Sequence, residues 1–323
     1  MSLKTRGEMV AALSAVLIIS GSVMVEELAA QQDFSNVQIE ATHVAGAVYM
    51  LVGQGGNIAV SSGPDGALMV DDEFAPLAGK IRAALREIGR SEEATDLKFL
   101  LNTHWHGDHT GGNVEFGPEA TIIAQTNVRK RLSTPQDRGN GNVTPASPDV
   151  ALPVITFDKS LDVHFNGERI SAIHIPHGHT DGDIVIYFTE SNVVHMGDDF
   201  FSGRFPFVDL SSGGSVEGML HGVAEVLADL PPDAKVIPGH GPLSTVDDLR
   251  LYHRMMEETI STVREEIGAG ATLEQIQAAG VSDEWAGWGE GFISTERWLE
   301  TIYRSLTDAG AGEYERHGHV HGS

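Results

Sequence analysis

Cysteine is absent from the 323-residue sequence, and basic residues are scarce beside acidic ones. The lack of cysteine excludes disulfides, thiolate zinc fingers and a cysteine nucleophile, so a transition metal could be bound only by His, Asp or Glu. Lys and Arg number 21 against 46 Asp and Glu, which gives a formal net charge of −25. Because so acidic a surface repels nucleic-acid phosphates and anionic membranes, we predict no nucleic-acid partner.

Long apolar runs are also missing, with one exception near the N-terminus. The stretch MVAALSAVLIISGSVMV (9–25) follows two basic residues and precedes the small residues Ala29 and Ala30. This order is typical of a secretory signal peptide, so we predict that residues 1–30 are removed near Ala30 and that the protein is periplasmic or secreted. An uncleaved membrane anchor is the alternative, because the stretch is nearly long enough to span a bilayer.

Between residues 37 and 243, short apolar runs alternate with turn signals and with helical periodicity. This pattern predicts a sheet-rich domain whose sheets are covered by helices. Strands are expected at 47–53, 57–62, 66–72, 97–102, 169–176, 183–189, 192–197 and 234–239, and helices at 74–89 and 215–230.

Two segments depart from that alternation. Residues 133–153 are rich in Pro, Gly, Asn and Ser and lack periodicity, so we expect a long surface loop that acts as a lid over the site. Beyond Leu243 the pattern is helical, which predicts a C-terminal helical extension over 244–310. A His-containing tail (311–323) follows, and we expect it to be disordered rather than to form a metal site.

The stretch NTHWHGDHTGGN places three histidines and an aspartate within six positions, directly after a buried strand. His104 and His106 are two residues apart, so in extended backbone both side chains can point the same way. Asp108 and His109 follow and would point to a neighbouring position. Imidazole nitrogen and carboxylate oxygen are the usual zinc ligands where no thiolate is available, so the stretch predicts ligands of metal sites rather than an incidental polar loop.

Three distant residues fit the same pattern. His179 stands in IPHGHTDGD, Asp198 in VVHMGDDFF and His240 in VIPGHGP, each after an apolar strand. Polar residues at strand ends are where a sheet scaffold presents chemistry. We therefore predict that these three residues complete the metal-binding set.

The ordered motifs HWHGDH, GHT, MGD and PGHG resemble the metallo-β-lactamase superfamily, and GGNIAV with the strand-ending pair Asp71-Asp72 adds to the match. This resemblance implies an α/β protein, an αββα sandwich with two metals at one edge between its sheets. It also implies two zinc sites, with iron or manganese as alternative metals. The implied ligands are His104, His106 and His179 for the first metal, and Asp108, His109 and His240 for the second, with Asp198 bridging the two or binding the second.

The aspartate at position 198 indicates which members of the superfamily the sequence resembles most. In the familiar zinc lactamases a Cys or Ser often stands at this position, whereas the Asp is similar to glyoxalase II and the lactonases. The expected function is an exported zinc-dependent hydrolase in which a metal-bound hydroxide opens a carboxylic amide or ester of a small molecule, with a β-lactam or lactone as the substrate. Asp108 is the candidate catalytic residue, because it could orient the hydroxide or pass a proton as well as bind metal.

Three alternatives stay open. The first is a glyoxalase II-like thioesterase. Against it, the sequence of the expected C-terminal helices has no basic cluster to bind a glutathione carboxylate, and export would separate the enzyme from cytosolic thioesters. The second is an iron-dependent redox member of the fold. A dinuclear iron site of this kind is expected to have a His-x-Glu-x-Asp motif, whereas in this sequence His106 stands at the position of the Glu. A non-catalytic periplasmic binding protein would be expected to have lost some ligands, yet all seven candidates are present. The sequence does not determine the oligomeric state.

Residues around the ligands have weaker signals. Arg204 in FFSGRFPF could receive a substrate carboxylate as a bidentate partner or be an ordinary surface arginine. The phenylalanines near it could wall an apolar pocket or pack under the C-terminal helices. We expect Thr180 or Asp181 to orient His179 or a neighbouring ligand through its free ring nitrogen. Three further histidines lie near these residues in the sequence. We assign His174 to the core or to the support of a ligand, and His195 to a structural role. His177 could contact the substrate.

Overall fold

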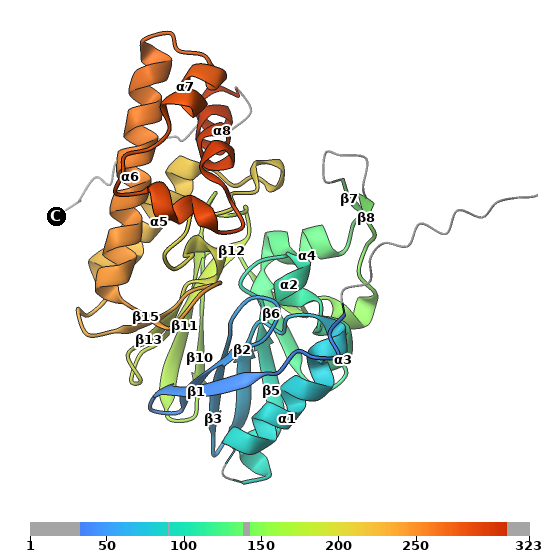
Figure 1. Cartoon of the computed structure of the whole chain (residues 1–323). Coiled ribbons are helices and arrows are strands. Elements are labelled where there is room, and N and C mark those ends of the chain that lie inside the picture. Colours follow the sequence, from blue (N-terminus) through green and yellow to red (C-terminus); the bar gives the residue numbers. More distant parts are fainter. Residues whose placement is uncertain (1–32, 90, 138–142, 309–323) are drawn as a thin grey trace, which may run out of the picture. The chain divides into compact units, whose positions relative to one another are not determined.

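The computed structural model describes residues 33–89, 91–137 and 143–308. The predicted signal peptide or anchor and the His-containing tail lie outside the described residues, so both stay predictions. Within the described part, no helix is both long enough and apolar enough to cross a membrane. The described chain forms two main sheets that pack on one another, with helices on their outer faces (Figure 1).

The first sheet has seven strands in the order β1-β2-β3-β4-β5-β6-β9. Its first four strands pair antiparallel, and the pairs β4-β5, β5-β6 and β6-β9 are parallel. The bounds are β1 (Glu40–Ala45), β2 (Val48–Val52), β3 (Ile58–Gly63), β4 (Gly66–Val70), β5 (Leu97–Leu101), β6 (Thr121–Gln125) and β9 (Ile155–Phe157).

The second sheet has six strands in sequential order from β10 to β15. All its pairs are antiparallel except β13 with β14, which is parallel. The bounds are β10 (Ser160–Phe165), β11 (Glu168–Ile175), β12 (Asp183–Phe188), β13 (Val193–His195), β14 (Lys235–Ile237) and β15 (Ser244–Thr245).

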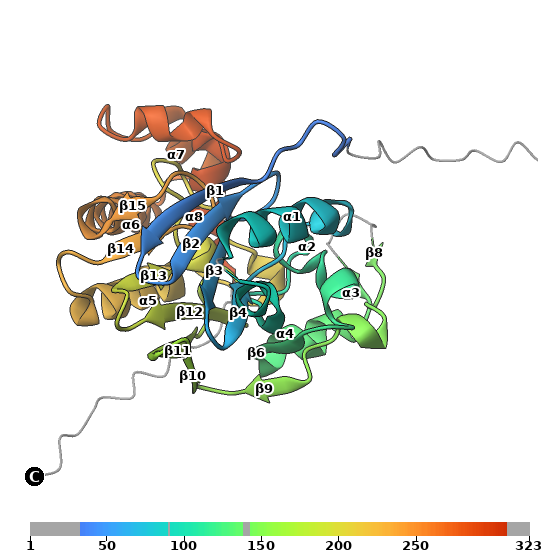
Figure 2. The same ribbon diagram turned by 90° about the horizontal axis from the view of Figure 1, so that it is seen from below.

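Central strands are apolar on both faces because each face meets a different layer. In β12, Ile184, Ile186 and Phe188 face the first sheet, while Val185 between them belongs to the cluster under the C-terminal helices. Helices α1 (Ala78–Ile88) and α3 (Asn113–Phe116) cover the outer face of the first sheet, and α5 (Val216–Asp229) and α6 (Val246–Gly268) cover the second (Figure 2). The predicted αββα sandwich is confirmed.

The sequence analysis missed seven strands: the internal strand β6, the edge strands β1, β9, β10 and β15, and the ribbon strands β7 (Gln136–Asp137) and β8 (Val143–Thr144). β1 and β10 lie at sheet edges, and most of their side chains are exposed or half-buried. An edge strand buries little apolar surface, so its sequence lacks the apolar run that reveals a central strand. The predicted internal strands agree with the observed ones to within a few residues.

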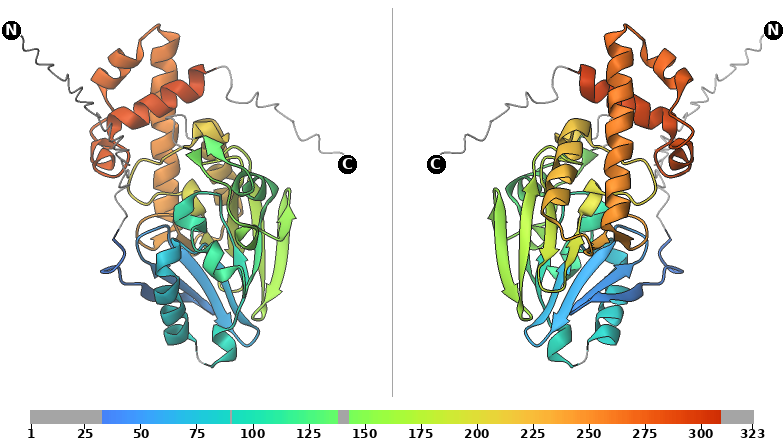
Figure 3. Two further views of the ribbon diagram at one scale, coloured as in Figure 1. Left: turned by 90° about the vertical axis from the view of Figure 1, so that its right-hand side faces the viewer. Right: turned by 90° about the vertical axis from the view of Figure 1, so that its left-hand side faces the viewer.

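The predicted C-terminal helical extension is present as α6, α7 (Leu273–Ala279) and α8 (Thr295–Thr307) (Figure 3). These helices share one hydrophobic cluster with α5 and the second sheet. Trp298 of α8 is fully buried there, donates from Nε1 to Oγ1 of Thr259 at 3.1 Å, and stacks on Phe205 with ring centroids 5.8 Å apart. The extension is thus part of the folded unit that carries the second sheet.

Replacing Trp298 with Ala tests this packing. The substitution removes a buried indole and leaves a cavity, so we expect the free energy of unfolding to fall by about 3–5 kcal/mol. Trp298→Phe keeps an aromatic ring and should cost less. Urea denaturation measures both values, and a loss below about 1 kcal/mol for Trp298→Ala would contradict the shared core.

Candidate metal centre

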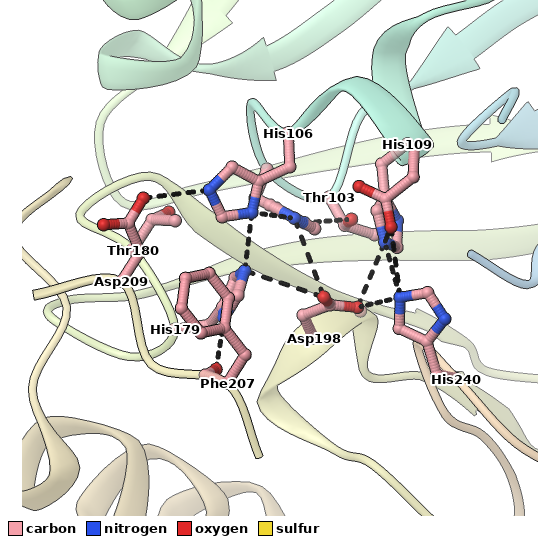
Figure 4. A network of polar contacts seen from close by, with 12 residues as sticks. Thr103, His106, His109, His179, Thr180, Asp198, Phe207, Asp209 and His240 are labelled. Carbon is pink, nitrogen blue, oxygen red and sulfur yellow. Dashed lines mark hydrogen bonds and ion pairs between the residues drawn. The ribbon is translucent and has the colours of Figure 1, made fainter. Parts of the chain in front are cut away.

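The seven predicted ligands converge at one edge of the sandwich, at the carboxyl ends of strands from both sheets (Figure 4). Four of them follow β5, either in the loop after it or in the short helix α2 (Gly107–Thr110). His179 lies between β11 and β12, Asp198 follows β13 in a 3-10 turn (η4, Gly197–Asp199), and His240 follows β14. The structure therefore brings together every residue that the sequence analysis assigned to the metals.

The first group consists of three buried imidazoles. Nδ1 of His106 lies 3.1 Å from Nε2 of His104 and 2.8 Å from Nε2 of His179. Three ring nitrogens directed at one another leave room for a shared cation among them, and three imidazoles are a common catalytic zinc set. The grouping is the one implied by the family resemblance.

The second group combines two imidazoles with one carboxylate. Nε2 of His240 lies 3.3 Å from Oδ2 of Asp108 and 3.4 Å from Nε2 of His109. The Asp108 oxygen lies 3.7 Å from Nε2 of His109. These three atoms again form a triangle of metal donors.

Asp198 lies between the two groups. Its Oδ2 is 3.9 Å from Nε2 of His104 and 3.6 Å from Nε2 of His179, both in the first group. Its Oδ1 is 3.1 Å from Nε2 of His109 and 3.5 Å from Nε2 of His240, both in the second. One carboxylate thus faces both groups, as expected of a ligand that bridges two metals. The nitrogen and oxygen donors fit transition metals such as zinc.

The first group is prepared for a metal by its burial. Burial lowers the pKa of His104 well below its usual range and that of His179 to about 4. Both rings are therefore neutral at physiological pH, and a neutral imidazole is the form that binds metal.

The second group is charged when no metal is bound. Burial alone would lower the pKa of His240, but the carboxylates of Asp198 and Asp108 outweigh it and raise the pKa to about 9. Burial likewise opposes ionisation of Asp108, yet His109 and His240 lower its pKa to about 2. A metal entering this group must displace a proton from His240 at neutral pH.

In three of the candidate ligand imidazoles, the second ring nitrogen contacts a fixed partner. Asp71 accepts from Nδ1 of His109 at 2.7 Å, and its carboxylate is held by the backbone N–H of Thr103 at 2.7 Å. Asp209 contacts Nε2 of His106 at 3.0 Å. The carbonyl oxygen of Phe207 lies 2.7 Å from Nδ1 of His179. Such partners fix the orientation and tautomer of a metal-binding ring.

Two of these supporting residues were not recognised from the sequence. Asp71 was noted only as a strand-ending acid, and its position directly after the apolar run that forms β4 is the signal that could have identified it. Asp209 lies 103 positions after His106 in an irregular segment, and no local pattern marks it. The predicted role of Thr180 or Asp181 in orienting His179 is wrong, because Thr180 contacts the carboxylate of Asp183 and Asp181 pairs with an arginine.

The other histidines have structural contacts. His174 is half-buried and bonds through Nε2 to the carbonyl oxygen of Asp181, which supports the loop after His179. His195 is buried and donates from Nε2 to the carbonyl oxygen of Asn57, as expected of a structural residue. His177 is exposed and does not line the cavity beside the ligands.

A cavity of about 390 Å³ opens beside the ligands. Four phenylalanines and Ile293 form one part of its wall and candidate ligands another, and Arg204 is the one cationic side chain among its lining residues in the described chain apart from the histidine ligands. Phe200 instead packs on Tyr252 under α6. The lining residues are His106, Gly107, Asp108, Asp198, Phe201, Arg204, Phe205, Phe207, His240, Phe292 and Ile293.

The predicted lid is not borne out by the described part of residues 133–153. This segment forms the ribbon β7 (Gln136–Asp137) and β8 (Val143–Thr144) and a 3-10 turn, and none of its described residues lines the cavity beside the ligands. It borders a separate, smaller cavity with Trp105 and Arg131. Its Pro and Asn content reflects turns, which sequence alone does not place relative to a site.

Residues 42–240 match the family described as the metallo-beta-lactamase superfamily. The chain belongs to this superfamily. Membership confirms the predicted fold and the predicted enzyme class, a metal-dependent hydrolase. The matched region contains all seven candidate ligands and ends at His240.

Relatives within the superfamily are similar at low identity. A hydroxyacylglutathione hydrolase of Prochlorococcus marinus is 25% identical over 199 residues, covering 53% of this chain and 68% of the relative. The lactamase-like protein aptB of Emericella nidulans is 26% identical over 230 residues, covering 69% and 62%. The probable metallo-hydrolase YqgX of Bacillus subtilis is 27% identical over 169 residues, covering 52% and 77%.

Two solved structures share the fold at 15% identity. The sec-alkylsulfatase Pisa1 from Pseudomonas sp. has a TM-score of 0.63, and the match covers 85% of this chain and 51% of that one. A metallo-beta-lactamase from Pontibacter korlensis has a TM-score of 0.56, with 68% and 99% covered. These superfamily members establish the fold of the chain and carry no information on its substrate.

Metal binding to this superfamily site should release protons. Since His240 is protonated below pH 9 in the metal-free protein and only its neutral form binds metal, apparent affinity should rise with pH and level off above about pH 9. Calorimetric zinc titrations at pH 7 in two buffers of different ionisation enthalpy measure the protons released. Identical heats in both buffers would contradict the prediction.

Proposed function

We propose that the protein is an exported hydrolase that binds two zinc ions and cleaves a small carboxylic ester or amide, with lactones and β-lactams as the substrate class. The observation that supports this proposal is the carboxylate of Asp198, whose two oxygens face different ligand groups. Two zinc ions in such a site supply an activated water at neutral pH and polarise a carbonyl oxygen. Export is proposed from the N-terminal pattern of residues 1–30 alone.

Asp108 is the proposed proton carrier. It lines the cavity, and 33% of its side chain is exposed, whereas the other carboxylate of the centre is nearly buried. Its pKa of about 2 keeps it ionised at neutral pH. An ionised carboxylate at this place can orient the attacking water, accept its proton and return the proton to the leaving group.

The cavity walls favour a substrate that is apolar with one anionic group. Phe201, Phe207 and Phe292 offer flat apolar surface for an acyl chain or ring. Arg204 offers a guanidinium that can bind a carboxylate with two parallel hydrogen bonds. A β-lactam with a ring carboxylate and an acyl side chain matches both features, and a lactone with an acyl side chain matches the apolar wall.

A thioester of glutathione is the second candidate, because several relatives are named hydroxyacylglutathione hydrolases at 25–32% identity. Glutathione carries two carboxylates and therefore requires more than one cationic contact. Among the described lining residues of the cavity, Arg204 alone offers a guanidinium or ammonium group. Because one guanidinium cannot bind both carboxylates of glutathione, we propose a carboxylic ester or amide as the first candidate substrate and the glutathione thioester as the second.

Arg204→Ala tests the proposed carboxylate contact. A hydrogen bond to a charged group contributes about 1.5–3 kcal/mol, so kcat/KM for a carboxylate-bearing substrate should fall about 10–100-fold, mainly through KM. An uncharged ester of similar size should be cleaved equally well by both proteins. Equal losses for the two substrates would contradict a specific carboxylate contact.

The proposed reaction is tested with a panel of substrates. Zinc-reconstituted protein from Gln31 onward is assayed with a β-lactam, an acyl-homoserine lactone and an S-acylglutathione, with and without a chelator. We expect chelator-sensitive hydrolysis of the first or second class, loss of activity in His104→Ala, and a fall of about 10²–10⁴-fold in kcat for Asp108→Asn.

The matched control is His164→Ala, which removes an exposed imidazole on β10 and should leave the rate unchanged. Hydrolysis of the glutathione thioester alone would favour the second candidate. Stoichiometric iron in the purified protein would overturn the zinc hydrolase, and two bound zinc ions without turnover of any substrate would contradict the proposed substrate class.

A further inference from the structure

The glycine-rich loop between β2 and β3 lies directly on the second ligand group. The backbone N–H of Gly56 donates to the carbonyl oxygen of Asp108 at 3.0 Å. A Cβ atom on Gly56 would lie only 2.5 Å from Nε2 and 2.6 Å from Nδ1 of His109. The imidazole therefore packs against bare backbone, and any larger residue at this position would displace it.

Asn57, the next residue, holds the segment that carries His240. Its Nδ2 donates to the carbonyl oxygens of Pro238 at 2.8 Å and Gly241 at 2.9 Å, and its backbone N–H donates to Gly239 at 2.8 Å. These three carbonyls belong to the residues on both sides of His240. The side chain of Asn57 is 3% exposed, so its bonds are shielded from water.

The loop 53–57 is also held by Glu73, which follows β4 of the first sheet. Glu73 is fully buried, and its Oε2 accepts from the backbone N–H of Gln54 at 3.2 Å. A Cβ atom on Gly53 would lie 2.5 Å from the same oxygen. The carboxylate therefore fixes the loop close to the first sheet, and Asn57 extends from this fixed position to the His240 segment of the second sheet.

The first ligand group is held by different residues. In the described chain, the contacts of the loop 53–57 reach Asp108, His109 and the segment around His240. His106 and His179 are instead held by Asp209 and Phe207, which lie in the segment after Asp198. The two groups share other supports, since Thr103 bonds both His104 and Asp71, the partner of His109. The hydrogen bonds that Asn57 donates, however, go to the segment that carries His240 of the second group.

We infer that Asn57 is a positioning residue for the second metal, because it fixes His240 relative to Asp108 and His109. The inference rests on the proposed two-metal site. It follows that the affinity for the second metal can be changed without changing the affinity for the first. Supporting partners of metal ligands contribute about 10–100-fold to metal affinity, which sets the size of the expected effect.

The experiment compares zinc binding to the metal-free wild type, Asn57→Ala and Asp209→Asn by calorimetric titration, with bound zinc counted by elemental analysis. Asn57→Ala should weaken the second zinc by about 10–100-fold and leave the first within about threefold. Asp209→Asn should weaken the zinc at the first group instead. Circular dichroism of each metal-free protein checks that it is folded.

The matched control is Asn113→Ala. It removes a buried amide that bonds to Asn102 and to the carbonyl oxygen of Ala151, away from the loop 53–57. Its loss of stability should resemble that of Asn57→Ala, but both zinc affinities should be retained. If Asn57→Ala does not fold, Asn57→Leu provides the same test, since it keeps the size of the side chain, adds no charge and removes both Nδ2 hydrogen bonds.

The outcomes are distinguishable. A wild type that binds a single zinc ion would refute the two-metal proposal and, with it, the role of Asn57. A wild type with two zinc ions and a folded Asn57 variant with unchanged affinities would overturn only the role of Asn57. Equal weakening of both metals by Asn57→Ala would also overturn it, because a general loss of structure would then explain the effect.

Discussion

A carboxylate removed from water is stable only if its charge is compensated, and Asp198 satisfies this condition between two groups of ligands. Its oxygens lie 3.1 to 3.9 Å from four imidazole nitrogens. Those imidazoles come from both sheets, so the centre exists only when the sheets are packed together. The seam between the sheets is filled with apolar side chains, which keep the site at low dielectric and strengthen each charge interaction in it.

The two ligand groups differ in protonation before a metal arrives. Burial keeps His104 and His179 neutral, whereas His240 is held positive by the carboxylates of Asp198 and Asp108. The first group is therefore ready for a cation, and the second exchanges a proton for one. This difference in protonation gives a physical basis for unequal metal affinities of the two groups.

The cavity is built partly outside the region common to the superfamily. The family match ends at residue 240, but Phe292 and Ile293 of the C-terminal extension line the cavity. Phe292 is 74% exposed and faces the ring of Phe207 across the opening. The candidate ligands thus come from the sandwich, while the extension contributes Phe292 and Ile293 to the cavity beside them.

The sequence by itself determined the candidate ligands and a sheet core covered by helices, since both depend on local order, and the ordered motifs indicated the superfamily and hence the αββα arrangement. His104 to His109 follow a buried strand directly, and apolar runs mark strands covered on both faces. The edge strands β1 and β10, the support of His106 by Asp209 and the contact of Asn57 with the His240 segment were decided only by tertiary structure. These contacts join residues 103 and 181 positions apart, and no local periodicity specifies which distant segments meet.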